Sequence, residues 1–263
     1  MASSASLAGD PLVQAVAAFV EDYMANHDPS HDFHHIRRVV GLAQHLAAAQ
    51  AADPLSPSQL PLDLRIVTLA ALLHDVGDRK YLPADQDDDG GTAALVRTTL
   101  LALGAAPALA AAVQAICAAV SWSREQADPG AAAAVLARHP ELAVVQDADR
   151  LDALGAVGAG RAFAYGAAMT RGPARSLQGT LAHFDDKLLR IEGSMKTRAG
   201  REMARERTRR LEVFQAWFEE EAALMWEGAP SGDVVGTGGP RAELGGKEGG
   251  GGRDGSRVEP PTA

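Results

Sequence analysis

Apolar residues recur at intervals of three and four positions along most of the chain, and this period is typical of amphipathic helices. The clearest case is the segment 33–51, in which Ile36, Val39 and Ala43 fall on one face. No segment alternates apolar and polar residues in the way of a half-buried strand, and there is no internal repeat. The pattern therefore predicts an all-α protein.

Breaks in this pattern divide the chain into its expected helices. Asp10-Pro11 is typical of a helix start, because an acceptor suits the N-cap and proline suits the first helical position. Prolines interrupt the pattern at 54–61, and 77–91 is an acidic, glycine-containing segment expected to be a solvated loop. The expected helices cover 11–24, 33–51, 64–75, 92–103, 107–121, 141–153, 156–169, 178–192 and 196–226.

The composition changes abruptly at Gly228, from which glycine runs alternate with prolines and scattered charges. Such a segment cannot bury enough apolar area to offset the entropy lost on ordering. We therefore expect a flexible N-terminus at 1–10, one helical domain over 11–227 and a disordered glycine-rich tail over 228–263.

The overall composition narrows the class of protein. Of 263 residues, 46% are hydrophobic and only 5% aromatic, a mixture that favours helices, and the net charge of −9 argues against nucleic-acid binding. A membrane span is not expected, because no run of about 18 apolar residues occurs. The single cysteine, Cys117, excludes an internal disulfide. Without a recognisable leader, the expected location is the cytoplasm.

The pair His74-Asp75 directly follows the apolar run 69–73. If both residues are helical, their side chains point about 100° apart and meet only at a point beside the helix, in a packed groove. Imidazole nitrogen and carboxylate oxygen together suit a divalent transition metal. The pair therefore predicts a metal site, but such a site needs further ligands.

Two other clusters could supply those ligands. One is rich in histidine and the other in aspartate. In the first cluster, the dipeptide His31-Asp32 has the same sequence as His74-Asp75. It lacks a preceding apolar run, so Asp32 is better interpreted as a helix N-cap. The candidate residues are His31, His34, His35, Asp147, Asp149 and Asp152.

Three segments carry a family resemblance. The sequences of 32–39 (DFHHIRRV), 74–80 (HDVGDRK) and 146–156 (QDADRLDALGA) resemble the HD-domain metal-dependent phosphohydrolases, in particular their YpgQ/YedJ-like branch. Shorter matches at 120–123, 160–163 and 183–189 extend the resemblance over about 10–226. The resemblance implies a helical HD-domain bundle.

The same resemblance implies a set of metal ligands. Its H…HD…D pattern falls on His35, on His74 and Asp75, and on Asp149, with Asp147 as the alternative for the last position. Relatives with two metals have extra histidines between the pair and the last aspartate.

Between Asp75 and Asp149 this chain has only His139, which precedes a proline. We therefore expect one divalent ion, with manganese favoured and cobalt, nickel, iron, zinc or magnesium as alternatives. Such an ion lowers the pKa of a bound water from about 15.7 toward roughly 7, which prepares it for attack on phosphorus.

Four further residues are candidates for the reaction and for substrate binding. Asp78 follows the pair by one turn and is predicted to orient the water or protonate the leaving oxygen; a cap or an ion pair with Arg79 is the less favoured alternative. Cations for substrate phosphates are expected at Lys80, Lys187 and Arg38; Arg38 lies three residues after His35 and so near its face of the helix.

The resemblance implies hydrolysis of nucleoside or deoxynucleoside triphosphates to monophosphate and pyrophosphate. The residues alone support only hydrolysis of a phosphoester or phosphoanhydride. A 5′-nucleotidase, an alarmone 3′-pyrophosphohydrolase and a non-catalytic nucleotide-binding HD module remain alternatives. The expected partner is a small nucleotide, with neither nucleic acid nor membrane; a homodimer is compatible with the sequence, which does not fix the oligomeric state.

Overall fold

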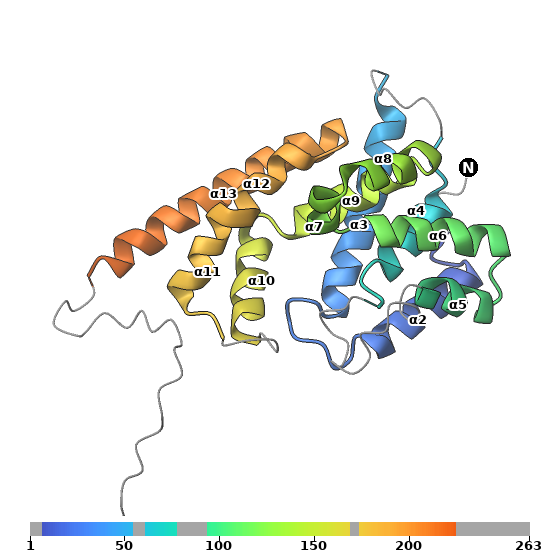
Figure 1. The fold of residues 1–263 in the computed structure, drawn as a ribbon, viewed down its shortest axis with the longest axis horizontal. Helices are drawn as coiled ribbons and strands as arrows, with labels where there is room; N and C mark the ends of the chain where they lie inside the picture. Colours follow the sequence, from blue (N-terminus) through green and yellow to red (C-terminus); the bar gives the residue numbers. More distant parts are fainter. Residues whose placement is uncertain (1–6, 55–60, 78–93, 169–173, 225–263) are drawn as a thin grey trace, which may run out of the picture. The chain divides into compact units, whose positions relative to one another are not determined.

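A computed structural model describes residues 7–54, 61–77, 94–168 and 174–224, and all regular elements in these ranges are helices (Figure 1). The all-α prediction is thereby confirmed. The helices are α2 (Pro11–Tyr23), α3 (Phe33–Ala52), α4 (Leu64–Leu73), α5 (Leu95–Ala102), α6 (Pro107–Ala119), α7 (Trp122–Ala127), α8 (Pro129–Arg138), α9 (Glu141–Asp152), α10 (Gly155–Ala168), α11 (Leu177–His183), the π-helix Phe184–Leu188, α12 (Leu189–Ile191), the 3₁₀ turn Glu192–Ser194 and α13 (Arg198–Ala222).

Three helices, α3, α4 and α9, pack against one another at the centre of the fold. The apolar faces that the sequence predicts are buried there: Ile36 and Val39 of α3, Leu69 of α4 and Val145 of α9 have no exposed surface. Burial of such side chains supplies most of the stabilisation of helices this short. This central packing brings together the segments that carry the candidate ligands.

Aspartate side chains cap the first helices. Asp10 accepts hydrogen bonds from the backbone of Leu12 and Val13, and Asp32 accepts one from the backbone of His35. Both predicted N-caps are confirmed, and the cap at Asp32 fixes the start of the helix that carries His35.

Helix α4 ends earlier than predicted. It stops at Leu73, His74 is its C-cap, and Asp75 lies in the turn that follows. Gly77 in this turn has a φ of 81°, a conformation that favours glycine. The interpretation of His74 and Asp75 as neighbours within a helix is therefore wrong: the turn, rather than helical spacing, sets the directions of their side chains.

Two helices between 122 and 138 were not predicted. Ser121 caps α7, and Asp128 caps α8, which has Pro129 in its first turn. These are ordinary start signals, but the short polar stretch between them lacks a helical apolar period. The predicted helix 178–192 is also divided, because a π-helical segment separates α11 from α12.

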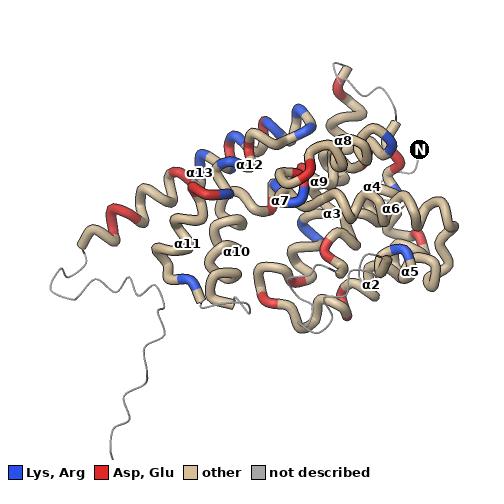
Figure 2. Tube along the Cα trace, in the orientation of Figure 1, with Lys and Arg blue, Asp and Glu red and all other residues tan. Residues whose placement is uncertain are grey.

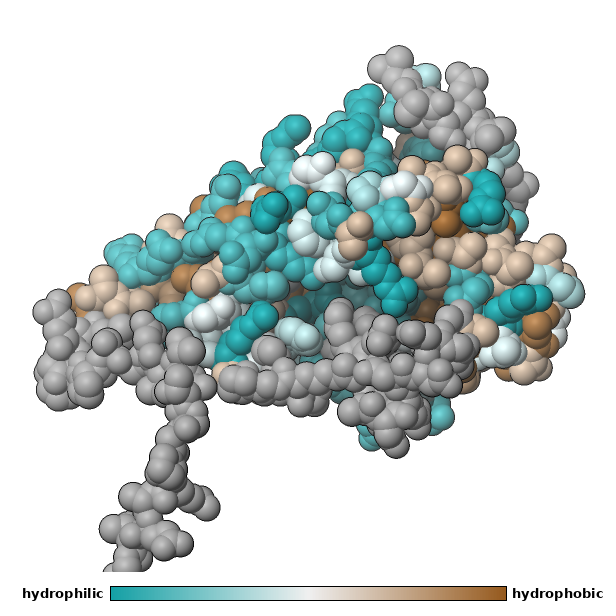
Figure 3. Space-filling model, in the orientation of Figure 1, coloured by the Kyte–Doolittle hydropathy of each residue, from teal (hydrophilic) through white to brown (hydrophobic). Residues whose placement is uncertain are grey.

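The last helix, α13, carries many charged residues (Figure 2). Its basic residues concentrate in the first half and its acidic residues at the end, and several pair along the exposed face, as Arg210 does with Glu206. Figure 3 shows hydrophilic side chains over α13 and apolar ones over α6 on the same face of the molecule. These charged residues form a solvated face of α13.

The predicted tail at 228–263 and the acidic loop beyond Gly77 lie outside the described residues, as do residues 1–6 of the predicted flexible N-terminus. Leu7, the first described residue, is buried, and the helical unit extends to Ala223. Among the described residues, no helix combines the length and the apolarity needed to cross a membrane.

Candidate metal centre

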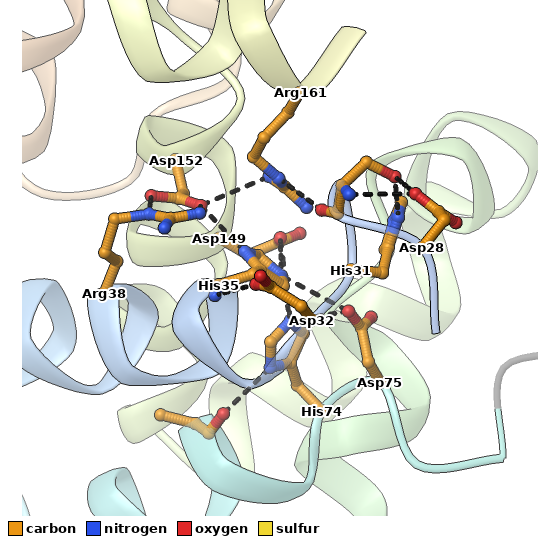
Figure 4. A network of polar contacts seen from close by, with 12 residues as sticks. Asp28, His31, Asp32, His35, Arg38, His74, Asp75, Asp149, Asp152 and Arg161 are labelled. Atoms are coloured by element: carbon orange, nitrogen blue, oxygen red, sulfur yellow. Dashed lines mark hydrogen bonds and ion pairs between the residues drawn. The ribbon is translucent and has the colours of Figure 1, made fainter. Parts of the chain in front are cut away.

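Four side chains from the three central helices converge at one point (Figure 4). His35 extends from the first turn of α3, His74 and Asp75 from the C-cap of α4 and the turn that follows it, and Asp149 from α9. The Nε2 atoms of the two histidines lie 3.2 Å apart, and Asp75 Oδ2 is 3.2 Å from the first and 3.4 Å from the second. Oδ1 of Asp149 lies 3.8 Å and 3.7 Å from the same two nitrogens.

The second nitrogen of each imidazole is held from behind. Nδ1 of His35 lies 2.8 Å from Asp152 Oδ2, and Nδ1 of His74 lies 2.8 Å from the carbonyl oxygen of Ala71. Because a carbonyl or carboxylate oxygen only accepts, each Nδ1 donates a proton, and a neutral ring then has a free lone pair on Nε2. When both rings are neutral, their lone pairs face the centre of the cluster, which is the arrangement that a metal ligand requires.

The charges of the cluster depend strongly on one another. Burial lowers the pKa of His74, but the carboxylates of Asp75 and Asp149 outweigh this effect and raise its pKa to about 9. Burial raises the pKa of Asp75, but the neighbouring His74 and His35 hold it well below its usual value. The pKa of Asp149 is lowered in the same way, chiefly by His74. The carboxylates are therefore ionised and require a positive partner.

The residues present fit a divalent cation. Oδ2 of Asp75 is buried and has no hydrogen-bond donor among the described residues, although a buried carboxylate oxygen normally has one. Atoms of His35, His74 and Asp75 lie close enough to share one ion. Two imidazoles and two carboxylates form a mixed nitrogen and oxygen set that suits manganese, iron, cobalt, nickel or zinc.

Asp152 supports the cluster from one turn further along α9. Besides His35, it accepts hydrogen bonds from Arg38 Nε at 2.8 Å and from an Arg38 terminal nitrogen at 3.0 Å. Burial raises the pKa of Asp152, but the bonds from His35 and Arg38 lower it to about 2. The structure therefore places Arg38 behind His35, on the carboxylate that orients it, and outside the cavity lining described below.

Asp147, the alternative ligand, points elsewhere. It accepts hydrogen bonds from the backbone of Lys196 at 2.8 Å and of Thr197 at 2.7 Å, and from the Thr197 hydroxyl at 2.7 Å. A Cβ on Gly200 would lie 2.3 Å from its Oδ2, so the start of α13 fits closely around this carboxylate. Asp147 thus joins α9 to α13, and Asp149 is the aspartate that lies beside the histidines.

A cavity of about 810 Å³ opens at the ligand cluster. Asp75 and Asp149 are the only carboxylates among its described lining residues. Several basic side chains line the remainder although the chain as a whole is acidic: Arg124, Arg150, Arg161, Arg175 and Lys187. Such a separation of charge suits a ligand with several negative groups.

Comparison with known proteins identifies the family. The HD-domain family model matches residues 32–154. YpgQ of Bacillus subtilis (strain 168), an uncharacterized protein, is 36% identical over 197 residues, which are 74% of this chain and 85% of that protein. The chain belongs to the HD-domain superfamily. The resemblance that the sequence indicates is thereby confirmed, including its YpgQ-like branch.

Solved HD-domain structures share the fold. The crystal structure of Bacillus subtilis YpgQ in complex with ADP is 32% identical, with a TM-score of 0.59, over 80% of this chain and 97% of that one. An HD-superfamily hydrolase from Bacillus thuringiensis is 29% identical, with a TM-score of 0.56, over 81% and 97% of the two chains. The chain is thus an HD-superfamily hydrolase of the metal-dependent phosphohydrolase family.

Of the other predicted residues of this HD domain, Lys187 lines the cavity, with Nζ 5.9 Å from the centre of the Trp122 ring. Asp78 and Lys80 lie outside the described residues. The structure therefore brings together all four predicted ligands and places Lys187 in the wall of the same cavity.

Two further cavity residues lie near the ligand cluster of the HD domain: His31, a candidate ligand from the histidine cluster, and Arg161, to which the sequence assigned no role. His31 lies beside His35, with ring centres 5.8 Å apart, and its Nδ1 is 2.6 Å from the hydroxyl of Ser30 (Figure 4). Arg161 donates to the Ser30 carbonyl oxygen at 2.6 Å and pairs with Asp152 at 3.4 Å. The match at 160–163 contains Arg161 but does not connect it to these residues; its hydrogen bond to Ser30 depends on the packing of α10.

Proposed function

We propose that this HD-domain protein is a metal-dependent nucleotide pyrophosphohydrolase. It cleaves nucleoside or deoxynucleoside triphosphates between the α- and β-phosphates, and it releases a monophosphate and pyrophosphate. Its family already identifies it as a metal-dependent phosphohydrolase. The proposal adds the substrate and the bond that is cleaved.

The observation that carries the proposal is the distribution of charge in the cavity. Carboxylates occur in its described lining only at the ligand cluster, and basic side chains stand among apolar and neutral ones in the rest of the lining. The volume of about 810 Å³ is within the usual range for small-molecule sites. The structure of the related YpgQ in complex with ADP supports a nucleotide as the ligand of this cavity.

The ligand-cluster residues and the groups that support them have different roles in the proposal. His35, His74, Asp75 and Asp149 hold one divalent ion, for which manganese is the preferred candidate. When bound, the ion supplies Lewis-acid activation of water and of the attacked phosphate. Asp152 and the Ala71 carbonyl keep the two imidazoles in the tautomer that presents Nε2.

The remaining predicted residues have distinct roles in the proposal. Lys187 contacts substrate phosphate, a role that its position in the cavity wall supports. Asp78 orients the water or protonates the leaving oxygen, and Lys80 is a further phosphate ligand. Arg38 acts through Asp152 rather than on the substrate, because its guanidinium is bound to that carboxylate.

Turnover of a nucleotide panel tests the proposal. Mono-, di- and triphosphates of ribo- and deoxyribonucleosides are incubated with protein in manganese, cobalt, nickel or magnesium, and a chelator serves as control. Chromatography separates pyrophosphate from phosphate. The matched variants are His74→Ala, in the cluster, and His45→Ala, on the exposed face of α3.

We expect metal-dependent release of pyrophosphate from triphosphates that His74→Ala abolishes and His45→Ala retains. Phosphate release from monophosphates would contradict the proposal and indicate a 5′-nucleotidase. Selective cleavage of alarmones at the 3′ position would indicate the corresponding pyrophosphohydrolase. Binding of nucleotide without any turnover, by protein shown to hold its metal, would indicate a non-catalytic module.

A further inference from the structure

A cluster of three basic side chains lines the cavity on a wall that contains no ligand of the metal cluster. Arg175 precedes α11, His183 ends α11, and Lys187 lies in the π-helix. All three side chains are half-buried and line the cavity. We call them the basic wall.

The acidic residues of the same segment lie outside the cavity. Asp185 and Asp186 are exposed and absent from the cavity lining, and Asp185 accepts a hydrogen bond from Gln215 of α13 at 3.1 Å. The segment therefore presents its cations to the cavity and its carboxylates to solvent. This sorting of charge is what binding of an anion inside the cavity requires.

The electrostatics of His183 show how strongly positive charge is concentrated here. Burial lowers the pKa of His183, and the charges of Arg175 and Lys187 lower it further, against a smaller opposing effect of Asp186. Arg175 and Lys187 thus lie close enough to His183 for their charges to act on its imidazole. A bound polyanion would relieve this repulsion.

Trp122 adds two features to this wall. Its ring lies under Lys187, with Nζ 5.9 Å from the ring centre, so one face of the ring holds a cation. Its Nε1 is buried and has no hydrogen-bond partner among the described residues. An indole nitrogen only donates, and leaving it unpaired costs free energy that an anionic oxygen would recover.

The basic wall is fixed against α10. The backbone nitrogen of Arg175 donates to the carbonyl oxygen of Gly166 at 2.9 Å, and a Cβ on Gly166 would lie 2.6 Å from the Thr180 hydroxyl. α11 can approach α10 this closely only because residue 166 is glycine. The backbone that carries Arg175 and the start of α11 is therefore held in place before any ligand binds.

We propose that Arg175, His183 and Lys187, with Trp122 holding Lys187, bind the β- and γ-phosphates of the substrate, and hence the leaving pyrophosphate. The inference rests on the proposed function. In that reaction the water oxygen bonds to the α-phosphorus, and the bridging P–O bond breaks. The bridging oxygen leaves with the electron pair as part of pyrophosphate, and protons from the water pass to solvent.

Titration with inorganic pyrophosphate tests the inference directly. Metal-loaded protein is titrated with the metal–pyrophosphate complex at a fixed concentration of free ion, and binding is followed by calorimetry. The variants are Arg175→Gln and Lys187→Met, each of which removes a charge and keeps most of the side chain. Arg190→Ala is the matched control, because Arg190 is exposed and, among the described residues, donates to a backbone carbonyl oxygen, that of Asp186, at 3.4 Å.

We expect each charge removal to weaken pyrophosphate binding roughly tenfold, which is the effect of losing one charge-assisted hydrogen bond, and to raise KM for triphosphates by a similar factor. Inhibition by the monophosphate product should not change. Pyrophosphate affinity equal to that of the unaltered protein in both variants would overturn the inference. Thermal unfolding of each variant establishes that it is folded.

Two variants of Trp122 distinguish the contribution of its ring from that of its N–H group. Trp122→Phe keeps a ring beneath Lys187 but removes the N–H, whereas Trp122→Leu removes both. The expected order of pyrophosphate affinity is the unaltered protein, then the phenylalanine variant, then the leucine variant. Equal affinity in all three would overturn the role of Trp122.

The two failures can be told apart. If triphosphates yield monophosphate and pyrophosphate but the basic-wall variants bind pyrophosphate normally, the inference fails and the proposed function stands. If pyrophosphate binding depends on the basic wall but no triphosphate is cleaved, the proposed function fails and the wall remains an anion site.

Discussion

The ligand cluster and the basic wall line the same cavity but are constructed differently. In the cluster both imidazoles are buried, and the nitrogen that faces away from the centre is hydrogen-bonded. In the basic wall the side chains are half-buried and extend from a segment that changes from α-helix to π-helix. Such π-helical segments occur frequently at functional sites.

This difference matches the demands on the two regions. Groups that hold an ion must be placed accurately before it binds, because small displacements of a ligand are costly. Groups that contact a flexible chain of phosphates can adjust their rotamers on binding. The comparison predicts that changes in the cluster lower the rate severely, whereas changes in the basic wall weaken binding modestly.

The largest effect is expected from Asp149→Asn, which removes a charge from the cluster. Loss of about 4 kcal/mol of metal-assisted stabilisation corresponds to a roughly 1000-fold lower kcat. Asp147→Asn is the matched variant two residues away, and it should retain the bound metal because Asp147 contacts α13 instead. Metal content and kcat of both proteins check the prediction, and the reverse pattern would assign the ligand role to Asp147.

A smaller effect is expected from Asp152→Asn, which leaves every ligand in place. The asparagine weakens the bonds that orient His35 and hold Arg38, and loss of such support typically costs 10–100-fold in metal affinity or activity. Asp185→Asn, on the exposed side of the π-helix, is the control. A metal affinity that responds equally to both changes would show that Asp152 has no orienting role.

Metal binding by the ligand cluster should depend on pH. In the metal-free protein the pKa of His74 is about 9, so this histidine is protonated at neutral pH and must lose its proton when it binds metal. We expect metal affinity to rise about tenfold per pH unit below about pH 9 and to level off above it. Calorimetry in buffers of different ionisation enthalpy counts the released protons, and a flat profile would contradict the prediction.

The smallest effect concerns stability rather than turnover. Gly200→Ala places a Cβ 2.3 Å from Asp147 Oδ2 and should lower the free energy of unfolding by about 1–3 kcal/mol. Gly160→Ala is the control in α10, because its Cβ would meet nothing within 4 Å; it should stabilise the protein by roughly 0.5–1 kcal/mol. Denaturant unfolding measures both changes, and equal shifts would show that the packing around Asp147 is not tight.

The central helices could be predicted because their apolar residues follow a helical period. Helix α3 begins at its predicted residue and ends one residue after the predicted end, at Ala52. The end of α4 could not be predicted, because no glycine or proline marks the end of the helix before Gly77. Helices α7 and α8 were missed because their caps stand in a short polar stretch with no apolar period.

The candidate site was predictable to the extent that its residues stand in local motifs. The sequence motifs around His35, His74 and Asp149 each resemble the family, and the fold brings these three residues together. Arg161 stands in the short match at 160–163, but that match assigns it no role, and Arg175 stands in none of the quoted matches; packing of α10 and α11 brings both to the cavity. Long-range packing is therefore the information that the sequence pattern alone did not provide.

The most direct test of the account is hydrolysis of a nucleoside triphosphate by metal-loaded protein in water enriched in heavy oxygen. Mass spectrometry then locates the label in the separated products. The account predicts one labelled oxygen in the monophosphate and none in the pyrophosphate, because water attacks the α-phosphorus. Label in pyrophosphate, or in free phosphate released together with a diphosphate, would contradict it.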